Sequence, residues 1–260
     1  MKGFVKVMIA GAVILGLGLI MFIAVLGLNG WHFKPDWKIE NYQCAQNSET
    51  IKIDYSAGKV KIVYYDGDAV KVEYPVSEKF ATTVTEESGT LKLISGKRQW
   101  YNLIWFGWDI PDTIIMLPRD AQPACDITLN AGTVDLADGN YKNINMTINA
   151  GAVTFGNITC GNLNLTLNAG AFGSSGITAD RITAEINAGA AELNNVVCGD
   201  VTAELNAGSL KAGISGDKEE YTVTVEAHAG SCNLSPATGT TDKRISVEIN
   251  AGSCTVNFEN

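Results

Sequence analysis

Apolar and polar residues alternate through the second half of the chain in a pattern that returns at a fixed spacing. Each return is centred on the tripeptide Asn-Ala-Gly. The first five copies end at glycines 19 residues apart, which are Gly132, Gly151, Gly170, Gly189 and Gly208. Two more copies follow at a spacing of 22, and these are His228-Ala229-Gly230 and Asn250-Ala251-Gly252. A repeat of this length predicts a stack of similar structural units.

Within one repeat the apolar residues occupy every second position. Ile144, Met146 and Ile148 precede Gly151 and are separated by polar residues, and this period of two is typical of a β-strand with one buried face. After the glycine the alternation resumes out of phase, beginning at Val153. A change of phase requires a bend, which glycine permits. Each repeat is therefore predicted to be a strand, a glycine corner with its alanine facing inward, a second strand and a turn.

A single unit of this size cannot bury its own apolar face, but stacked units can, with equivalent strands about 4.8 Å apart. We therefore predict an all-β fold, a β-solenoid or β-helix-like stack of 19–22-residue repeats. A right-handed coil is expected rather than a left-handed one.

The asparagines of the tripeptides are then expected to form a column. Stacked amides in such a column hydrogen-bond to one another, so we interpret it as a structural ladder, and a ligand-binding row is the alternative. His228 stands in the column before its last member. The members of the ladder are Asn130, Asn149, Asn168, Asn187, Asn206 and Asn250.

The N-terminal segment predicts a membrane anchor. Val7–Leu28 contains 22 residues without a charge, which at about 1.5 Å per residue spans a hydrocarbon core of roughly 30 Å. The run is longer than the apolar region of a cleavable signal peptide, and no convincing cleavage site follows it. Residues 1–28 are thus expected to be an uncleaved transmembrane signal anchor. Lys2 and Lys6 favour a cytoplasmic N-terminus, which places the repeats outside the cell membrane.

Residues 29–48 are expected to form a juxtamembrane tether. The repeat template first occurs at residues 51–62, where a serine occupies the asparagine position. An insertion follows, with strand patterns near residues 91–94 and 114–117. Because the ends of repeat stacks need covering, we expect residues 49–123 to form the first coil and an N-terminal cap. Residues 124–260 are then expected to form seven Asn-Ala-Gly coils, with no comparable cap after the last.

The insertion contains an aromatic cluster between residues 100 and 108, with three tryptophans, a tyrosine and a phenylalanine. We expect the cluster to fold over the first coil and to bury Trp105. Trp100 and Trp108 are expected to be more exposed, and they are candidate contact residues because exposed aromatic side chains mark protein, glycan and membrane-interface surfaces.

These features together resemble a known bacterial family. A single N-terminal membrane segment precedes an Ile-x-Ile opening at Ile51, an Ile-x-Leu-Pro strand at residues 115–118 and the glycine-centred strands. This arrangement is similar to the β-strand-repeat family of unknown function whose members carry the label putative adhesin. The resemblance implies a cell-envelope protein with a solenoid-like ectodomain, sometimes associated with envelope-stress systems. It implies no catalytic residues.

The remaining composition offers little chemistry. A net charge of −9 argues against nucleic-acid binding, and neither a zinc-ligand spacing, a phosphate loop nor a nucleophile motif is present. We expect no cofactor and no metal centre. The six cysteines do not form a disulfide framework. Cys232 and Cys254 occupy equivalent positions of adjacent coils, within bridging range, but buried free thiols are the expected state.

One outward column is acidic. Stacked carboxylates about 4.8 Å apart repel one another by about 1 kcal/mol per pair in water. We interpret the column as a solvated face with Arg181, Lys211 or Arg244 as nearby partners. A strip that binds cations or a basic partner is the alternative. Its members are Glu185, Glu204, Glu226 and Glu248.

The function that these patterns favour is that of a non-enzymatic surface protein, anchored in the cell membrane, whose rigid solenoid presents an interaction face. Its partner would be an envelope or extracellular protein or a glycan. A regulatory or sensing component of an envelope-stress system is the first alternative. An enzyme that acts on polysaccharides is the second, because β-helices host such enzymes, but the fold alone is a weak argument.

Overall fold

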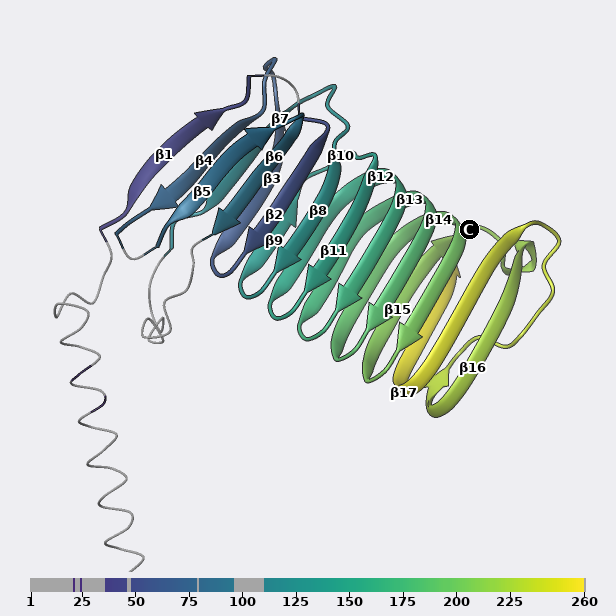
Figure 1. Ribbon diagram of the computed structural model, residues 1–260. Coiled ribbons are helices and arrows are strands. Elements are labelled where there is room, and N and C mark those ends of the chain that lie inside the picture. The colour runs from purple at the N-terminus through teal and green to yellow at the C-terminus, as the bar shows by residue number, and fades with distance from the viewer. Residues whose placement is uncertain are drawn as a thin grey trace, which may run out of the picture.

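The computed structural model describes residues 21, 24, 36–45, 48–78, 80–95 and 110–259. Their strands join in one 17-stranded sheet, which is wound into an elongated stack of coils (Figure 1). The fold is therefore all-β and solenoid-like, as the sequence predicted. The elements are β1 (Lys38–Gln43), β2 (Thr50–Tyr55), β3 (Lys59–Tyr65), β4 (Lys71–Val76), β5 (Thr82–Glu87), β6 (Thr90–Ser95), β7 (Thr113–Pro118), β8 (Ala124–Leu129), β9 (Thr133–Leu136), β10 (Gly139–Asn140), β11 (Asn143–Ile148), β12 (Ala152–Leu167), β13 (Ala171–Ile186), β14 (Gly189–Leu205), β15 (Gly208–Ser215), η1 (Lys218–Glu220), β16 (Tyr221–Cys232) and β17 (Lys243–Glu259).

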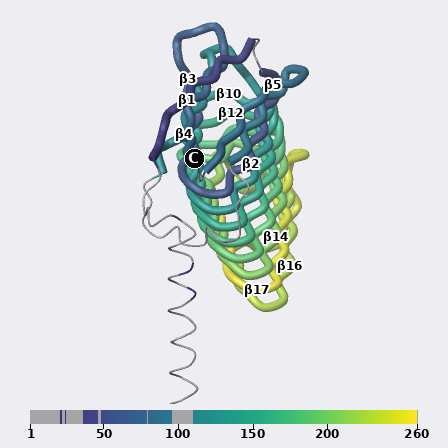
Figure 2. The backbone as a smooth tube through the Cα atoms, turned by 60° about the vertical axis from the view of Figure 1, so that its left-hand side comes forward, coloured from purple at the N-terminus to yellow at the C-terminus, as the bar shows by residue number. Residues whose placement is uncertain are grey.

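Equivalent residues of successive coils lie beside one another in parallel register. Ile144 of β11 pairs with Leu163 of β12, and Leu163 pairs with Ile182 of β13. All three side chains are fully buried. The apolar positions before each glycine thus form columns that face the core, and the coils stack behind one another along the axis of the solenoid (Figure 2).

Each coil has a third side where the sequence predicted a turn. Strands β12, β13 and β14 continue through a second bend, and Ile158, Ile177 and Val196 lie in register on this side and are buried. Because the neighbouring coils satisfy the backbone groups on both sides of the chain, the coil closes without a separate turn.

The corner glycines are required by two features of the backbone. Gly151 has a φ of 128°, a conformation that other residues resist. A Cβ at this position would also lie 2.2 Å from the carbonyl oxygen of Gly132 in the neighbouring coil. Stacked corners therefore approach too closely for any side chain. The alanine before the glycine is exposed in six of the seven repeats, and the seventh, Ala251, is half-buried. The prediction that this alanine faces inward was therefore wrong, because Asn and Ala both lie on the outside of the bend.

The coils at the C-terminal end do not stack in sequence order. Strand β17 pairs with both β14 and β15 on one side and with β16 on the other, so the last repeat of the sequence lies inside the stack and the preceding one lies outside it. Ile245, Val247 and Ile249 of β17 are buried, whereas the equivalent Ala227 of β16 is exposed. The more apolar copy gains more from being covered on both sides. We expected the stack to end with the last repeat, and this was wrong.

At the N-terminal end, too, two coils exchange places, so that their order in space differs from their order in the sequence. Strands β6 and β7 pair with β2 and β3, which in turn pair with β8 and β9. The outer coil is then covered, since β5 pairs with β6 and β4 pairs with both β7 and β1, all in antiparallel orientation. Residues 38–43, which we expected within a tether, form β1, and Trp37 packs edge-on against Phe80 with ring centroids 5.6 Å apart.

Two sequence predictions fall on residues that the structure does not describe. The aromatic cluster at residues 100–108, with Trp100, Trp105 and Trp108, lies outside the described residues. So does the apolar run Val7–Leu28, apart from residues 21 and 24. Within the described part of the chain, no helix has the length and apolar character needed to cross a membrane.

Candidate functional site

One outer face of the solenoid carries the asparagine column. In each step the side-chain Nδ2 of one asparagine donates to Oδ1 of the asparagine in the neighbouring coil. The donor–acceptor pairs are Asn149–Asn130 at 2.8 Å, Asn168–Asn149 at 2.8 Å, Asn187–Asn168 at 2.9 Å, Asn206–Asn187 at 2.8 Å and Asn250–Asn206 at 2.8 Å. The amides therefore bond to one another along the column.

The two ends of this ladder differ from the sequence prediction. At the first end Asn130 donates to Oδ1 of Asp54 at 3.2 Å, whereas Ser56, the residue aligned with the asparagines, bonds to Ser95. At the other end His228 does not interrupt the column. Its strand neighbours pair with the residues on either side of Asn250, so His228 lies beyond the last asparagine. The exchange of the last two coils moves it there.

The acidic column lies beside the ladder, and its spatial order also differs from its sequence order. Glu185 pairs with Glu204, Glu204 with Glu248, and Glu248 with Glu226. Amides of the ladder bond to two of these carboxylates, since Asn187 donates to Glu185 at 3.0 Å and Asn206 donates to Glu204 at 3.3 Å. Glu226 lies on the outermost coil, in β16, and Glu248 lies on the coil beneath it, in β17.

Two of the three basic residues that we expected beside this column have other partners. Arg181 bonds to Asp200 at 3.0 Å, and Lys211 bonds to Glu192 at 2.8 Å. Among the described residues, no lysine or arginine forms an ion pair with the four glutamates, and Arg244 forms none at all. The column is thus an acidic strip without cationic partners.

The described residues contain no group of three or more His, Cys, Asp or Glu side chains that could hold a metal ion. Calcium takes six to eight oxygen ligands around one centre. A single row of carboxylates on consecutive strands places its oxygens along a line instead, which disfavours the metal-binding interpretation of Glu185, Glu204, Glu226 and Glu248.

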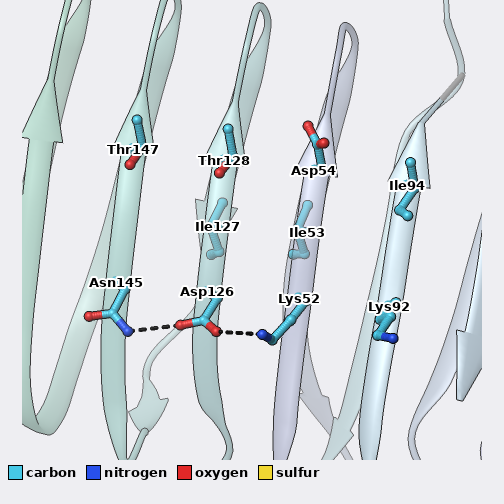
Figure 3. Close-up of a pocket in the computed structure, with 10 residues that line it drawn as sticks. All are labelled: Lys52, Ile53, Asp54, Lys92, Ile94, Asp126, Ile127, Thr128, Asn145 and Thr147. Atoms are coloured by element: carbon cyan, nitrogen blue, oxygen red, sulfur yellow. Dashed lines mark hydrogen bonds and ion pairs between the residues drawn. The ribbon is translucent and has the colours of Figure 1, made fainter. Parts of the chain in front are cut away.

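A shallow hollow of about 380 Å³ crosses the same face near the N-terminal end (Figure 3). Asp126 makes two polar contacts in this hollow. It accepts a hydrogen bond from Asn145 at 2.8 Å and forms an ion pair with Lys52 at 3.5 Å. Asp54, at the rim, accepts from Asn130. Both carboxylates are engaged by neighbouring coils, so the hollow presents no unpartnered acid and base of the kind that hydrolysis of a glycoside requires.

The outer edge of β16 is the feature that sequence reasoning missed. On its inner side β16 pairs with β17. On its outer side only the first residues are covered, since Val223 forms an antiparallel bridge with Ala237 and the Gly239 N–H donates to the Thr222 hydroxyl at 3.1 Å. From Glu226 to Ser231 every residue is exposed. In the described part of the chain no other strand pairs with this edge. The sequence contains only a weak sign of this open edge, which is that Ala227 occupies an inward position where the other repeats have isoleucine or leucine.

Several titratable groups are buried in the core or packed against it. Burial raises the pKa of the Cys160 thiol to about 11. Burial likewise raises the pKa of Tyr64 to about 12, and its hydroxyl donates to the backbone oxygen of Asn140 at 2.8 Å. The pKa of the Tyr141 hydroxyl, packed edge-on against Tyr64, is also raised by burial. All three groups remain protonated at neutral pH.

The stacked parallel coils, the covered first end and the open last end define a β-solenoid protein that offers surfaces but no assembled catalytic group in its described residues. Comparison of the sequence with family models matches the Toastrack DUF4097 family over residues 48–260. The chain belongs to this family, which confirms the resemblance seen in its sequence. No curated protein matches the chain.

Three solved structures resemble the chain and share little sequence with it. A cell adhesion protein from Clostridium sporogenes, itself described as putative, is 13% identical with a TM-score of 0.39, covering 86% of this chain and all of its own. A putative adhesin from Bacteroides fragilis is 14% identical with a TM-score of 0.48 and the same coverage. A putative adhesin from Parabacteroides distasonis is 11% identical with a TM-score of 0.43, covering 87% and 99%.

Proposed function

We propose that the protein is a non-enzymatic surface protein of the cell envelope, anchored in the membrane by residues 1–28, whose solenoid presents an open strand edge to a partner protein. The observation that carries this proposal is the uncovered edge of β16. This edge lies at the opposite end of the stack from β1, the first strand after the predicted anchor (Figure 1). A solenoid anchored at one end would hold its binding edge away from the membrane.

The backbone of β16 is suited to pairing with an added strand. The N–H and C=O of Val223 both point away from β17, because they bond to Ala237 at 2.8 and 3.0 Å. Alternate residues of a strand point to the same side, so the N–H and C=O groups of Val225 and Ala227 also point outward. An extended segment of a partner could bond to them, which is the mode of recognition known as strand addition.

The edge also lacks the features with which proteins prevent such pairing. Edge strands are usually protected by lysine, proline, a bulge or a covering segment. Residues 224–232 contain neither lysine nor proline, and β16 pairs with β17 in continuous register. By contrast, the outer coil at the other end is covered by β4 and β5. The uncovered edge of β16 is therefore available for pairing with a strand of a partner.

The anchor and the orientation remain part of this proposal. A single-pass protein with a cytoplasmic N-terminus and extracytoplasmic repeats is supported by the uncharged run Val7–Leu28 and the lysines before it. A right-handed coil is supported by the general preference of parallel strands for right-handed crossovers. Protease added to intact cells should release the solenoid, and full protection would contradict this orientation.

A site-specific cross-linking experiment tests the binding edge. A photo-reactive amino acid at Ala229, introduced into the full-length protein in intact cells, should cross-link to a defined partner. Ala227→Pro removes the outward N–H and should abolish this cross-link, whereas Ala227→Ser retains the N–H and should preserve it. Both variants should melt near the wild-type temperature, because the Ala227 N–H has no partner among the residues that the structure describes. A cross-link that persists in Ala227→Pro would contradict strand addition, and one lost on glycosidase treatment would indicate a glycan partner instead.

A further inference from the structure

Two cysteines meet at the outer end of the solenoid. Cys232, the last residue of β16, pairs in register with Cys254 of β17. Paired residues of neighbouring parallel strands lie about 4.8 Å apart, and the Cα atoms of disulfide-bonded cysteines usually lie between about 4.4 and 6.8 Å apart. The exchange of the last two coils leaves this pair adjacent, at the junction between the outermost coil and the coil beneath it.

The two thiols are neighbours that differ in exposure. Burial raises the pKa of the Cys254 thiol, and the adjacent Cys232 thiol raises it further. Cys254 is only 2% exposed, whereas Cys232 is partly exposed. An oxidant in solution therefore reaches Cys232 first, and Cys254 lies behind it.

The residue after Cys232 holds the pair in place. The side chain of Asn233 forms two hydrogen bonds with the backbone of Val256. Its Nδ2 donates to the carbonyl oxygen of Val256 at 2.8 Å, and its Oδ1 accepts from the N–H of Val256 at 2.8 Å. The backbone N–H of Asn233 also donates to the carbonyl oxygen of Cys254 at 3.3 Å. These three bonds tie the end of β16 to the stretch of β17 that contains Cys254, which keeps the two cysteines side by side.

The other described cysteines lack this arrangement. Cys160 and Cys198 occupy the same column but are separated by Ala179 of the intervening coil, so their Cα atoms are about two strand spacings, roughly 9.6 Å, apart. Cys44 and Cys125 are buried, and the strand partners of Cys125 are Ile51 and Ile144. Among the six, only Cys232 is partly accessible and has a thiol neighbour.

We propose that Cys232 and Cys254 form a reversible disulfide that fastens the outermost coil to the body of the solenoid. The reaction is a thiol–disulfide exchange with a small-molecule or protein disulfide as the oxidant. The Cys232 thiol loses its proton and attacks the oxidant, which forms a mixed disulfide and releases one thiol. The Cys254 thiol then loses its proton and attacks Sγ of Cys232, which forms the Cys232–Cys254 bond and releases the second thiol. Two electrons pass to the oxidant, whose disulfide is reduced to two thiols.

The geometry explains why the bond would be reversible. Side chains of in-register parallel strands project side by side rather than toward each other, so the outer strand must shift to close the bond. Strand β16 can shift because much of its outer edge is unpaired. A disulfide closed against such an adjustment is strained, and strained or exposed disulfides are reduced more easily than structural ones.

The full-length protein in detergent provides the test, with oxidised and reduced glutathione as the probe. At a high ratio of oxidised to reduced glutathione, peptide mapping should find a linked peptide containing Cys232 and Cys254, and intact mass should fall by two hydrogens. Amide hydrogen exchange in residues 221–232 should slow about tenfold on oxidation and recover on reduction. Cys232→Ser should abolish both effects. Cys160→Ser, a buried cysteine without a thiol neighbour, should retain both.

Two outcomes would overturn the proposal. One is a stable glutathione adduct on Cys232 with no linked peptide, because Cys254 would then be unable to complete the exchange. The other is a linked peptide without slower exchange in residues 221–232, because the bond would then not fasten the coil. Cys232→Ser replaces a partly exposed side chain and should therefore fold, which a melting curve checks.

Discussion

Asn250 donates a hydrogen bond from Nδ2 to Oδ1 of Asn206 at 2.8 Å, across 44 positions of the chain. This bond places β17 directly on the coil of Asn206 and leaves His228 outside. A double-mutant cycle should measure it: Asn206→Ala and Asn250→Ala are expected to couple by about 0.5–1.5 kcal/mol in the free energy of unfolding, because both remove the same bond. Urea denaturation of the two single variants and the double variant gives the coupling.

The matched control is a second double-mutant cycle, in which His228→Ala takes the place of Asn250→Ala. The cycle of Asn206→Ala with His228→Ala should show no coupling beyond about 0.3–0.5 kcal/mol, the limit within which independent sites add. A larger coupling with His228 than with Asn250 would mean that the coils stack in sequence order.

The corner glycines make a second prediction. Gly151→Ala should destabilise the protein by at least about 2 kcal/mol, because the residue has a positive φ and a Cβ would collide with the carbonyl oxygen of Gly132. Gly173→Ala is the control, since nothing lies within 4 Å of a Cβ at that position, and it should change stability by less than about 0.5 kcal/mol. Thermal melts of both variants distinguish a requirement for glycine at the corner from a general cost of replacing glycine.

The interior of the stack could be predicted from the sequence because every repeat carries the same local information. The apolar columns that contain Leu163 and Ile182, the glycine corners and the alignment of the asparagines all follow from a period that the chain repeats with little change. The third side of the coil was missed because Ile158 and its equivalents lie in stretches rich in Gly and Asn, which resemble turns when read alone.

The ends of the stack could not be predicted in the same way. A repeat period states which residues are equivalent, but not which copy lies on which. A polar side chain stands at the ladder position in both of the last two repeats, His228 in one and Asn250 in the other, so the order depends on which copy tolerates an open side. Ala227 in β16 loses little when exposed, whereas Ile249 in β17 is fully buried. That comparison concerns the whole assembly and is invisible in any single repeat.

Alkaline pH should weaken the fold through its buried thiols. Burial raises the pKa of Cys160 from 9.0 to about 11, so the folded state favours the protonated thiol. This stabilisation is fully present below the unfolded pKa of about 9 and is lost as the pH rises from 9 towards 11, because the unfolded chain then releases the proton first. For Cys160 the loss between pH 8 and pH 10 is about 1 kcal/mol.

Urea melts at pH 8, 9 and 10 test this prediction. Cys160→Ala should lose about 1 kcal/mol less stability over that range than the wild type, and alanine fits the column because Ala179 occupies the equivalent position of the next coil. Thr159→Ala, which changes the adjacent exposed and non-titrating residue, should keep the full wild-type loss. Equal pH dependence of Cys160→Ala and the wild type would show that this thiol does not couple to folding.

The acidic strip gives the last prediction, and it depends on the order of the coils. In the structure Glu248 lies between Glu204 and Glu226, so it has two carboxylate neighbours about 4.8 Å away, whereas Glu226 has one. Glu248→Gln should therefore stabilise the protein by about 0.5–1 kcal/mol at low salt, and Glu226→Gln by roughly half as much. Both gains should nearly vanish in 1 M salt, where the screening length falls to about 3 Å.

A third variant separates the repulsion from a general effect of removing charge. Glu192→Gln removes a carboxylate that is paired with Lys211 at 2.8 Å, so it should leave stability unchanged or slightly lower. Urea melts of the three variants at low and high salt give the comparison. If the coils stacked in sequence order, Glu226 would lie between Glu204 and Glu248, and the larger gain would come from Glu226→Gln. The ranking of these two substitutions thus tests the arrangement of the terminal coils without any change to the core.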